Sequence, residues 1–322
     1  MKNKKSGIIA QIMITAVLSA LVVTQCAKDP VATTHHTAGH WDYTNPAIWA
    51  TDFPTCGGTE QSPVDFDNTL TANNNLTAGA ASALTFAGYT NTMASWSYKN
   101  NGHTLQATPS DVTSTGYSIS APNNSSRCTT CAAAGAPITF NLQQYHFHAP
   151  SEHTVNGNAF DMEMHFVHKY TNTTDNTDHY AVIGILINSD TAPNAPDLAT
   201  SLTSTPATGN NASLTSAVNQ ILTDLTGAAI DAVVPATLPN VADPTQILAD
   251  IALAQGHATT LGHFNYQGSL TTPPCTEAVD EWLVIDTPVK IANATLQSFL
   301  TVYSNNARPA LPQGTRTFTL NP

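Results

Sequence analysis

Hydrophobic and polar residues alternate along two long segments near the middle of the chain, residues 138–148 and 159–170. Successive side chains of a β-strand point to opposite faces of a sheet, so this pattern predicts two strands. Gln144, His146 and His148 would share one face of the first strand, with aromatic residues between them on the other face. The first strand therefore presents two histidines and an amide on the same side.

The second strand carries a matching set of polar side chains. Glu163 and His165 share one face, and Asn156-Gly157, a strong signal for a tight hairpin turn, lies between the two strands. Folding the chain back at that turn would bring three imidazoles together, and three histidines with an open fourth position form the usual catalytic zinc site. Gln144 and Glu163 each precede a histidine by two residues on the same face, so we expect them to accept hydrogen bonds from metal-bound imidazoles.

The rest of the chain alternates in shorter segments that are separated by turns. We predict further strands at residues 96–98, 104–106, 117–119, 180–187, 284–285 and 317–319. Two segments have the helical period instead, residues 214–225 and a segment that starts at Pro244, because proline favours the first position of a helix. The apolar residues of the second helix are Ile247, Leu248, Ile251 and Leu253. Both helices lie inside the β-rich region, so we predict one domain.

Length and charge narrow the possible classes of protein. The chain has 322 residues, of which 41% are hydrophobic and 10% charged, enough for one large domain or two small ones. Its formal net charge is −12, and residues 1–26 hold three lysines and no acid, so the remainder is more acidic still. Such a chain is a poor candidate for binding nucleic acid or an anionic membrane surface.

The first 26 residues are typical of a secretory signal. Three lysines precede an apolar segment at residues 8–23, which is short for a membrane span. Residues 21–26 resemble a lipoprotein signal ending in Cys26, although Gln25 departs from the small residue expected there. We therefore expect a periplasmic or extracellular protein, either anchored through a lipidated Cys26 or cleaved and free, with a polar tether at 27–39 and a catalytic domain at 40–322.

Four cysteines remain after Cys26, and an even number in an exported chain favours disulfide bonds. Cys128 and Cys131 lie in a segment of small residues, with no strand-to-helix pattern before them, so a local bridge is favoured over a redox centre. A second zinc site is the alternative. Cys56 would then pair with Cys275, and closing a loop of that length would stabilise the fold by about 4–5 kcal/mol in the chain-entropy model.

Three separated motifs point to one family. They are Gln61-Ser62-Pro63-Val64, the two histidine strands together with Ser151-Glu152-His153-Thr154-Val155, and Gly268-Ser269-Leu270-Thr271-Thr272-Pro273-Pro274-Cys275. The chain resembles the α-class carbonic anhydrases, and in particular their secreted bacterial members, from about residue 40 to 316. The resemblance implies a mainly β single domain, with a large twisted, mostly antiparallel sheet of about ten strands and a few peripheral helices. It also implies the reversible hydration of carbon dioxide to bicarbonate and a proton by a zinc-bound hydroxide.

The resemblance assigns roles to individual residues. His146, His148 and His165 would hold Zn²⁺, and Asn306 would support one of them through its backbone carbonyl. Thr271 would orient the hydroxide through a hydrogen bond to Glu152, and His103 would shuttle protons. The shuttle's water network would be ordered by Tyr43, Asn101 and Gln106. The carbon dioxide pocket would be lined by Val167, Val182, Leu270, Thr272 and Trp282. His153 would pair with Tyr266.

One feature departs from the family pattern, and one alternative function remains to be weighed. The segment from Cys275 to Trp282 is one residue longer than in the family, so Asp280 stands where a valine is expected unless a bulge restores Val279. A catalytically weak binding module with the same fold is the alternative function. Such domains lose one or more of the zinc histidines, whereas this chain has all three and also Glu152 and Thr271. We therefore predict an enzyme.

Overall fold

The computed structural model describes the chain between His40 and Asn321, with gaps. The described residues are 40–66, 76–78, 85–87, 89, 95–110, 117–122, 128, 130–132, 136–192, 210–237, 243–254 and 261–321. All of them belong to one compact unit that spans residues 38–322. The expected signal sequence, Cys26 and the tether lie outside the described residues.

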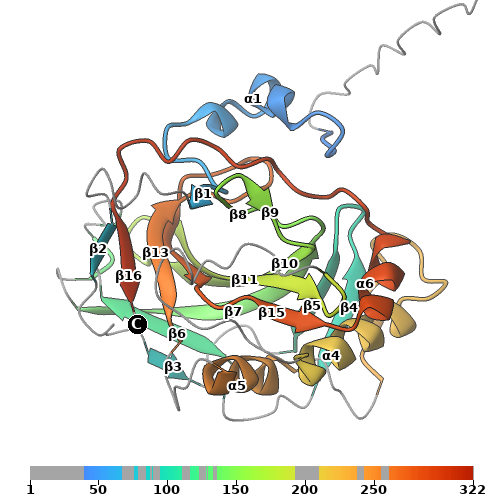
Figure 1. The fold of residues 1–322 in the computed structure, drawn as a ribbon. Coiled ribbons are helices and arrows are strands. Elements are labelled where there is room, and N and C mark those ends of the chain that lie inside the picture. Colours follow the sequence, from blue (N-terminus) through green and yellow to red (C-terminus); the bar gives the residue numbers. More distant parts are fainter. Residues whose placement is uncertain are drawn as a thin grey trace, which may run out of the picture. The chain divides into compact units, whose positions relative to one another are not determined.

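A thirteen-stranded sheet dominates the fold (Figure 1). Its main path runs through β12 (Val234–Pro235), β4 (Trp96–Asn100), β5 (Leu105–Pro109), β7 (Pro137–His148), β10 (Met162–Thr171), β11 (Asp178–Ser189), β14 (Val279–Ile285), β13 (His263–Gly268), β16 (Phe318–Asn321) and β2 (Leu76–Ala78). The strands β3 (Thr85–Ala87), β6 (Ser118–Pro122) and β15 (Val289–Ile291) lie off this path. All pairs in this sheet are antiparallel except β11 with β14, β11 with β15 and β16 with β2, so the mainly β, mostly antiparallel prediction is confirmed.

The two histidine strands are neighbours at the middle of the sheet. β7 and β10 pair antiparallel, with His146 opposite His165 and His148 opposite Glu163. The connection between them contains a small hairpin of β8 (Thr154–Val155) and β9 (Asn158–Ala159), which joins β1 (Asp65–Phe66) in a second sheet. Asn156 and Gly157 form its turn with φ angles of 48° and 76°, a left-handed conformation that asparagine and glycine tolerate best. The turn signal in the sequence thus predicted how the two strands meet.

The longer helices cover one face of the sheet. They are α4 (Ala212–Asp224), α5 (Pro244–Ala254) and α6 (Asn293–Leu300). Their buried side chains share a hydrophobic core with β7, β10 and β11; its members include Leu214, Ile247, Phe299, Tyr145, Phe147, Met164, Phe166 and Ile183. Because adjacent strand residues alternate between faces, the histidines between these apolar residues point away from the helices.

The predicted helices are present, and the apolar residues of α5 differ in their exposure. Leu253 of α5 is 77% exposed, whereas Ile247 and Ile251 are fully buried. At 100° per residue, Leu253 lies on the opposite side of the helix from those isoleucines. Helix α6 was not predicted, and a short helical segment of η1 (Pro46–Ile48), α1 (Trp49–Asp52) and η2 (Pro54–Gly57) precedes the sheet.

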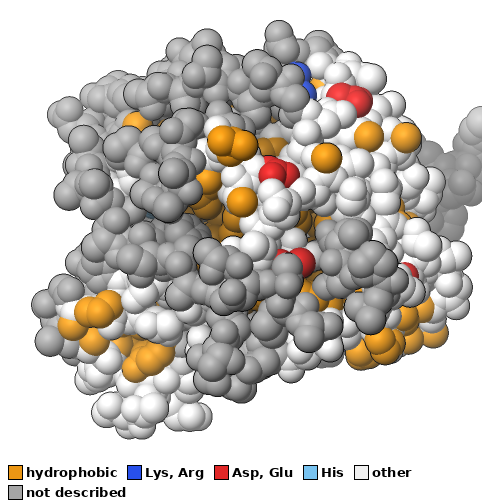
Figure 2. Space-filling view, turned by 90° about the horizontal axis from the view of Figure 1, so that it is seen from below, with side chains coloured by type: hydrophobic (Ala, Val, Ile, Leu, Met, Phe, Trp, Pro, Cys, Tyr) orange, Lys and Arg blue, Asp and Glu red, His pale blue; other side chains and the backbone are white. Residues whose placement is uncertain are grey.

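None of the described helices is long and apolar enough to cross a bilayer. Figure 2 shows separate groups of hydrophobic side chains on the face seen from below, with polar and acidic atoms between them.

Candidate active site

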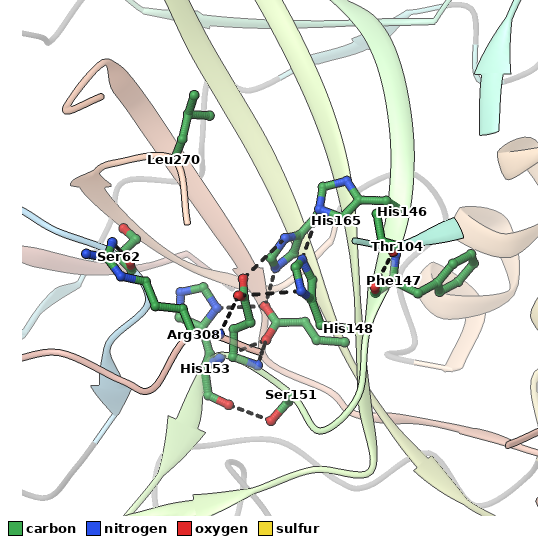
Figure 3. Close-up of polar contacts among 12 residues, drawn as sticks. Ser62, Thr104, His146, Phe147, His148, Ser151, His153, His165, Leu270 and Arg308 are labelled. Carbon is green, nitrogen blue, oxygen red and sulfur yellow. Dashed lines mark hydrogen bonds and ion pairs between the residues drawn. The ribbon is translucent and has the colours of Figure 1, made fainter. Parts of the chain in front are cut away.

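Three histidines converge on the face of the sheet that the helices leave open (Figure 3). The Nε2 atoms of His146 and His148 are 2.9 Å apart, and the ring centroid of His165 lies 5.2 Å and 4.7 Å from the centroids of those two rings. One nitrogen from each of the three rings lies within 4.8 Å of the others. The structure therefore brings together the three residues that the strand pattern selected.

Each imidazole is held by an oxygen on its outer side. His146 Nδ1 lies 2.8 Å from Gln144 Oε1, and His165 Nε2 lies 2.7 Å from Glu163 Oε1. The Nδ1 atom of His148 lies 2.7 Å from the backbone oxygen of Asn306. Because the three oxygens act as acceptors, each places the N–H of its histidine on the outer nitrogen. The inner nitrogen of each neutral ring then carries a lone pair that points toward the other two.

This arrangement fits a bound cation. Burial, together with the neighbouring His148 and His165, lowers the pKa of His146 well below its ordinary value, so that ring is neutral at pH 7. Lone pairs that face each other at 2.9 Å repel unless a positive centre lies between them. A tetrahedral zinc with Zn–N bonds of about 2.0–2.1 Å would place its nitrogen ligands about 3.3 Å apart, which needs only a small adjustment. The donor set of three neutral imidazoles is one that zinc favours.

Glu163 holds together the side of the site behind His165. Its Oε2 accepts the backbone N–H groups of Glu152 and His153 at 2.9 and 2.8 Å. Its Oε1 also lies 2.6 Å from Nδ1 of His153, whose Nε2 lies 2.6 Å from the hydroxyl of Tyr266, so the expected pairing of His153 with Tyr266 is present. Burial opposes the charge of Glu163, but the His153 and His165 imidazoles outweigh it and keep the pKa of Glu163 well below its ordinary value.

Glu152 has one satisfied and one unsatisfied oxygen. Its Oε1 accepts the backbone N–H of Arg308 at 2.8 Å and lies 3.4 Å from His148 Nδ1. Its Oε2 is buried and has no hydrogen-bond partner among the described residues. The expected hydrogen bond from Thr271 to Glu152 is not present in the described part of the chain. A buried carboxylate oxygen without a donor is a place where a hydroxyl hydrogen would be bound strongly.

A cavity of about 330 Å³ opens beside the three histidines. It is lined by His146, His165, Gln144, Thr271, Thr272, Val167, Val182, Leu270, Trp282, Gln143, Lys169 and Tyr180. All the residues expected to form the carbon dioxide pocket are among them. The sequence reasoning missed the last three, although alternation along β10 and β11 already places Lys169 with Val167 and Tyr180 with Val182. Gln143 reaches the cavity because the β7–β10 register shifts opposite Val167 and His168.

Comparison with known proteins identifies the family. A family model described as eukaryotic-type carbonic anhydrase matches residues 44–230 and 236–319. The chain belongs to this family. It is 31% identical over 281 residues to a carbonic anhydrase of Pectobacterium carotovorum, covering 85% of this chain and 87% of that one. It is 29% identical over 307 residues to a carbonic anhydrase of Neisseria gonorrhoeae, covering 93% and 94%.

Solved structures agree on the fold. The α-carbonic anhydrase of Thermovibrio ammonificans, solved with the inhibitor sulfanilamide, matches with a TM-score of 0.59 and 23% identity, over 87% of this chain and 98% of that one. The α-carbonic anhydrase of Photobacterium profundum matches with a TM-score of 0.58 and 24% identity, over 87% and 100%. At these identities the likeness establishes the fold alone.

The residues expected to move protons lie at the edge of the site. The partly buried ring of His103 stacks on Trp41, with centroids 3.8 Å apart, and Tyr43 lies between His103 and His148 at 6.4 and 6.5 Å. Burial, together with His40, lowers the pKa of His103 below its ordinary value. His103 is not among the residues that line the cavity. Trp41 was not predicted; an aromatic residue in the first folded segment gives only a weak signal for such a role.

The loop before His103 is shaped by its own asparagine. Asn101 Oδ1 accepts the backbone N–H groups of His103 and Thr104 at 2.9 and 2.8 Å, and its Nδ2 lies 3.4 Å from Gln106 Oε1. The expected pair of polar residues is therefore assembled next to the histidine. Asn306, which supports His148, also donates from Nδ2 to the backbone oxygen of His103 at 2.9 Å.

A β-bulge absorbs the extra residue before Trp282. Tyr180 pairs with Val279 and Ala181 pairs with Glu281, so Asp280 is the unpaired residue of β14. Val279 is fully buried in the hydrophobic cluster that contains Val182 and Trp282. The bulge therefore keeps a valine in the same cluster as Val182 and Trp282, which line the cavity, and turns Asp280 elsewhere.

Both expected disulfides are present. Cys56 and Cys275 are joined with an S–S distance of 2.02 Å and pack against Trp49. Cys128 and Cys131 are joined as well, with their Cα atoms 5.4 Å apart. The first bond fixes the segment that follows Thr271 and Thr272 to the N-terminal helices.

Proposed function

We propose that this carbonic anhydrase hydrates carbon dioxide reversibly with a zinc ion held by His146, His148 and His165. The observation that carries the proposal is the convergence of three lone pairs whose opposite ring nitrogens are all tied to acceptors. Zinc bound there would lower the pKa of a bound water from about 15.7 to about 7 and so supply a nucleophile at neutral pH. No other set of three histidines comes together in the described part of the chain.

The chain's own residues then orient the reactants. The unsatisfied Oε2 of Glu152 supports a role as the final acceptor in a chain of hydroxyl groups that passes through Thr271, which lies in the cavity wall. Carbon dioxide has no hydrogen-bond donor, and the apolar side chains of Val167, Val182 and Trp282 suit it better than they suit water. Thr271 and Glu152 thus fix the direction of attack, and the apolar wall holds the substrate beside it.

His103 would carry the released proton to solvent. An imidazole whose pKa lies somewhat below 6.5 accepts a proton briefly and gives it up readily at neutral pH. Tyr43 lies near both this ring and His148, and Asn101 and Gln106 form a hydrogen-bonded pair next to His103, so the three residues would order bridging water. Stacking on Trp41 would hold the ring at the mouth of the site.

A binding module without catalysis is the second candidate. It would not need three histidines whose outer nitrogens are all held by acceptors, nor a buried carboxylate such as Glu163 that accepts four N–H groups. Keeping such a polar network buried destabilises a fold unless every member is satisfied. Its retention favours the enzyme.

Metal analysis and a stopped-flow hydration assay test the proposal together. Purified protein is expected to bind about one zinc per chain and to hydrate carbon dioxide, and His165→Ala is expected to lose both. His168→Gln is the matched control, because His168 lies on the same strand but faces the other side of the sheet, 3.1 Å from the backbone oxygen of Phe166. Zinc content near zero after reconstitution would refute the proposed site, and bound zinc without hydration would favour the binding module.

We also propose that the chain is exported. The positive and apolar leader supports export, and so do two disulfides, which persist in oxidising compartments. Mass spectrometry of the mature N-terminus from membrane and soluble fractions would distinguish a lipidated Cys26 from a free cleaved chain. An uncleaved leader in every fraction would refute export.

A further inference from the structure

A second group of metal-binding side chains lies on the other face of the central sheet. One ligand atom from each of Cys128, Cys131 and His179 lies within 4.8 Å of the others. His179 precedes Tyr180, which lines the active-site cavity, so alternation along β11 turns His179 to the opposite face. Cys131 packs against the hydrophobic core on that face. The group is therefore separate from His146, His148 and His165.

His179 is oriented as a metal ligand would be. Its Nδ1 lies 2.9 Å from Oδ2 of Asp280, and the two residues are 5% and 2% exposed. A carboxylate that accepts Nδ1–H leaves the lone pair of a neutral imidazole on Nε2. That Nε2 lies 3.2 Å from Oγ1 of Thr177, but Thr177 donates its own hydroxyl hydrogen to Asp175 at 2.6 Å. The lone pair of His179 therefore receives no proton from Thr177.

The bulge in β14 is what supplies this carboxylate. Asp280 is the extra residue of the bulge, between Val279, which pairs with Tyr180, and Glu281, which pairs with Ala181. A buried carboxylate is costly unless it is paired, and His179 is its partner. The extra residue thus leaves Val279 in the cluster with Val182 and Trp282 and adds a carboxylate–histidine pair beside Cys128 and Cys131.

The two cysteines have the spacing of a zinc-binding pair. Two thiolates separated by two residues are a frequent half of a tetrahedral zinc site, and a histidine is a frequent third ligand. Asn172 donates from Nδ2 toward the sulfur of Cys128 at 3.6 Å, which would stabilise negative charge on that atom. In the oxidised protein both sulfurs are consumed by their mutual bond, so the site can form only after reduction.

We propose that reduction of the Cys128–Cys131 bond creates a second metal site, in which the two thiolates and His179 bind a divalent ion such as zinc and Asp280 orients the imidazole. A dithiol reductant breaks the S–S bond, gives two electrons and two protons to the cysteines, and leaves as its own disulfide. Binding of the divalent ion then releases the two thiol protons to solvent. The disulfide stabilises the same loop when the protein is oxidised, so the two states are alternatives for one pair of cysteines.

Cobalt titration of the full-length protein tests the proposal. The protein is reduced with a phosphine, which leaves no competing dithiol, and Co²⁺ is added while the near-ultraviolet absorption of cobalt–thiolate bonds is followed. The three-histidine site contains no sulfur, so its occupancy does not contribute to this absorption. The result is therefore independent of whether the proposed zinc site or the hydration reaction is correct.

The reduced protein is expected to develop the absorption and to saturate at about one cobalt per chain, and the oxidised protein is expected to show none. Cys131→Ser should abolish it, which also excludes a contribution from Cys56 and Cys275. His179→Gln should weaken cobalt binding by at least about tenfold, and Asp280→Asn by roughly 10- to 100-fold. His263→Gln is the matched control, because His263 is equally buried and bonds the backbone oxygen of Leu261 at 2.6 Å.

Two results would overturn the proposal. The first is a reduced protein without the absorption, which would show that the cysteines do not bind metal. The second is an affinity that His179→Gln leaves at the level of the His263→Gln control, which would show that the thiolates bind without the histidine. If His179→Gln does not fold, the comparison of Cys131→Ser with Asp280→Asn decides, because unchanged binding in both also refutes the site.

Discussion

The carboxylate of Glu163 lies at the centre of the hydrogen bonds behind the metal site, and its replacement tests how that site is held. Oε2 accepts two backbone N–H groups at 2.9 and 2.8 Å, and Oε1 faces imidazole nitrogens of His153 and His165 at 2.6 and 2.7 Å. The variant Glu163→Gln replaces one of these oxygens by an NH₂ group, which cannot accept a hydrogen bond.

The expected cost follows from the number of donors. Whichever way the new amide turns, two of the four donors face its NH₂ group. A buried donor left unsatisfied costs about 1–3 kcal/mol, so the free energy of unfolding should fall by roughly 2–6 kcal/mol. The free energy of unfolding of a typical folded protein is about 5–15 kcal/mol, so this loss is a large share of it. The same change frees the outer nitrogen of His165, so metal affinity should fall by about 10- to 100-fold.

Urea unfolding of the metal-free protein at about pH 6, followed by metal titration, measures both effects. The matched control is Glu281→Gln on β14, which lies two strands from β10 in the same sheet. Burial raises the pKa of Glu281 to about 7, and among described residues its carboxylate accepts a hydrogen bond from Asn265. A carboxyl that is mostly protonated in the folded protein at about pH 6 already resembles an amide, and it ionises in the unfolded chain, so this control should lose no stability.

The reasoning fails if the two variants lose the same stability, because the cost would then come from removing any buried carboxyl on these strands. It fails equally if Glu163→Gln is as stable as the unmodified protein, since four N–H groups would then not depend on the carboxylate. Lost metal affinity with unchanged stability would confine the role of Glu163 to orienting His165.

Three further predictions concern catalysis and pH. His103→Ala should lower kcat for hydration by up to about 100-fold in weak buffer, leave kcat/KM nearly unchanged, and recover with added imidazole; an unchanged kcat would assign the proton to another group. Thr271→Ala and Glu152→Gln should each slow hydration roughly 30- to 1000-fold with zinc still bound, and the double variant should add little; additive losses in stopped-flow assays would separate the two roles. For Glu281, the folded pKa lies above the unfolded value, so its carboxyl destabilises the fold increasingly from about pH 4.3 to about pH 7. Urea unfolding should therefore show Glu281→Gln gaining stability relative to the unmodified protein as the pH rises through that range, and a constant difference would contradict the raised pKa.

Much of the central site was predictable because it depends on local periodicity. A repeat of two residues placed His146 and His148 on one face, and the Asn156-Gly157 turn predicted the return of the chain that brings His165 beside them. Gln144 and Glu163 followed from the same alternation. These contacts lie within one strand or between two adjacent ones, where backbone geometry leaves few alternatives.

Other parts of the site depend on contacts between distant segments. Asn306 supports His148 across a separation of 158 residues, and only the resemblance to a family suggested it. The Nη1 and Nη2 groups of Arg308 donate to the backbone oxygens of Ser62 and Cys56, 246 and 252 residues away. No periodic pattern in the sequence predicts such contacts, because they depend on how the last loop crosses the sheet.

The alternation of hydrophobic and polar residues also could not predict where side chains point at bulges and register shifts. The shift in the β7–β10 register turns Gln143 into the cavity, and the bulge in β14 turns Asp280 out of it. A bulge changes the face of a single residue, and its position is fixed by packing on both sides of the strand rather than by the residues of that strand. The exposure of Leu253 was likewise not predictable, since the period of a helix does not say how much of its circumference is covered.

The sequence by itself determined the strand faces, the hairpin that joins the two histidine strands, and the set of three imidazoles with two of their acceptors. The tertiary structure alone decided which strands lie beside β7 and β10, how Val279 comes to pack in the cluster of Val182 and Trp282, and that His179, Asp280 and the Cys128–Cys131 bond share the far face. The physical reason is that alternation is a property of each strand's backbone, whereas neighbours across the sheet are chosen by burying apolar surface from the whole chain at once.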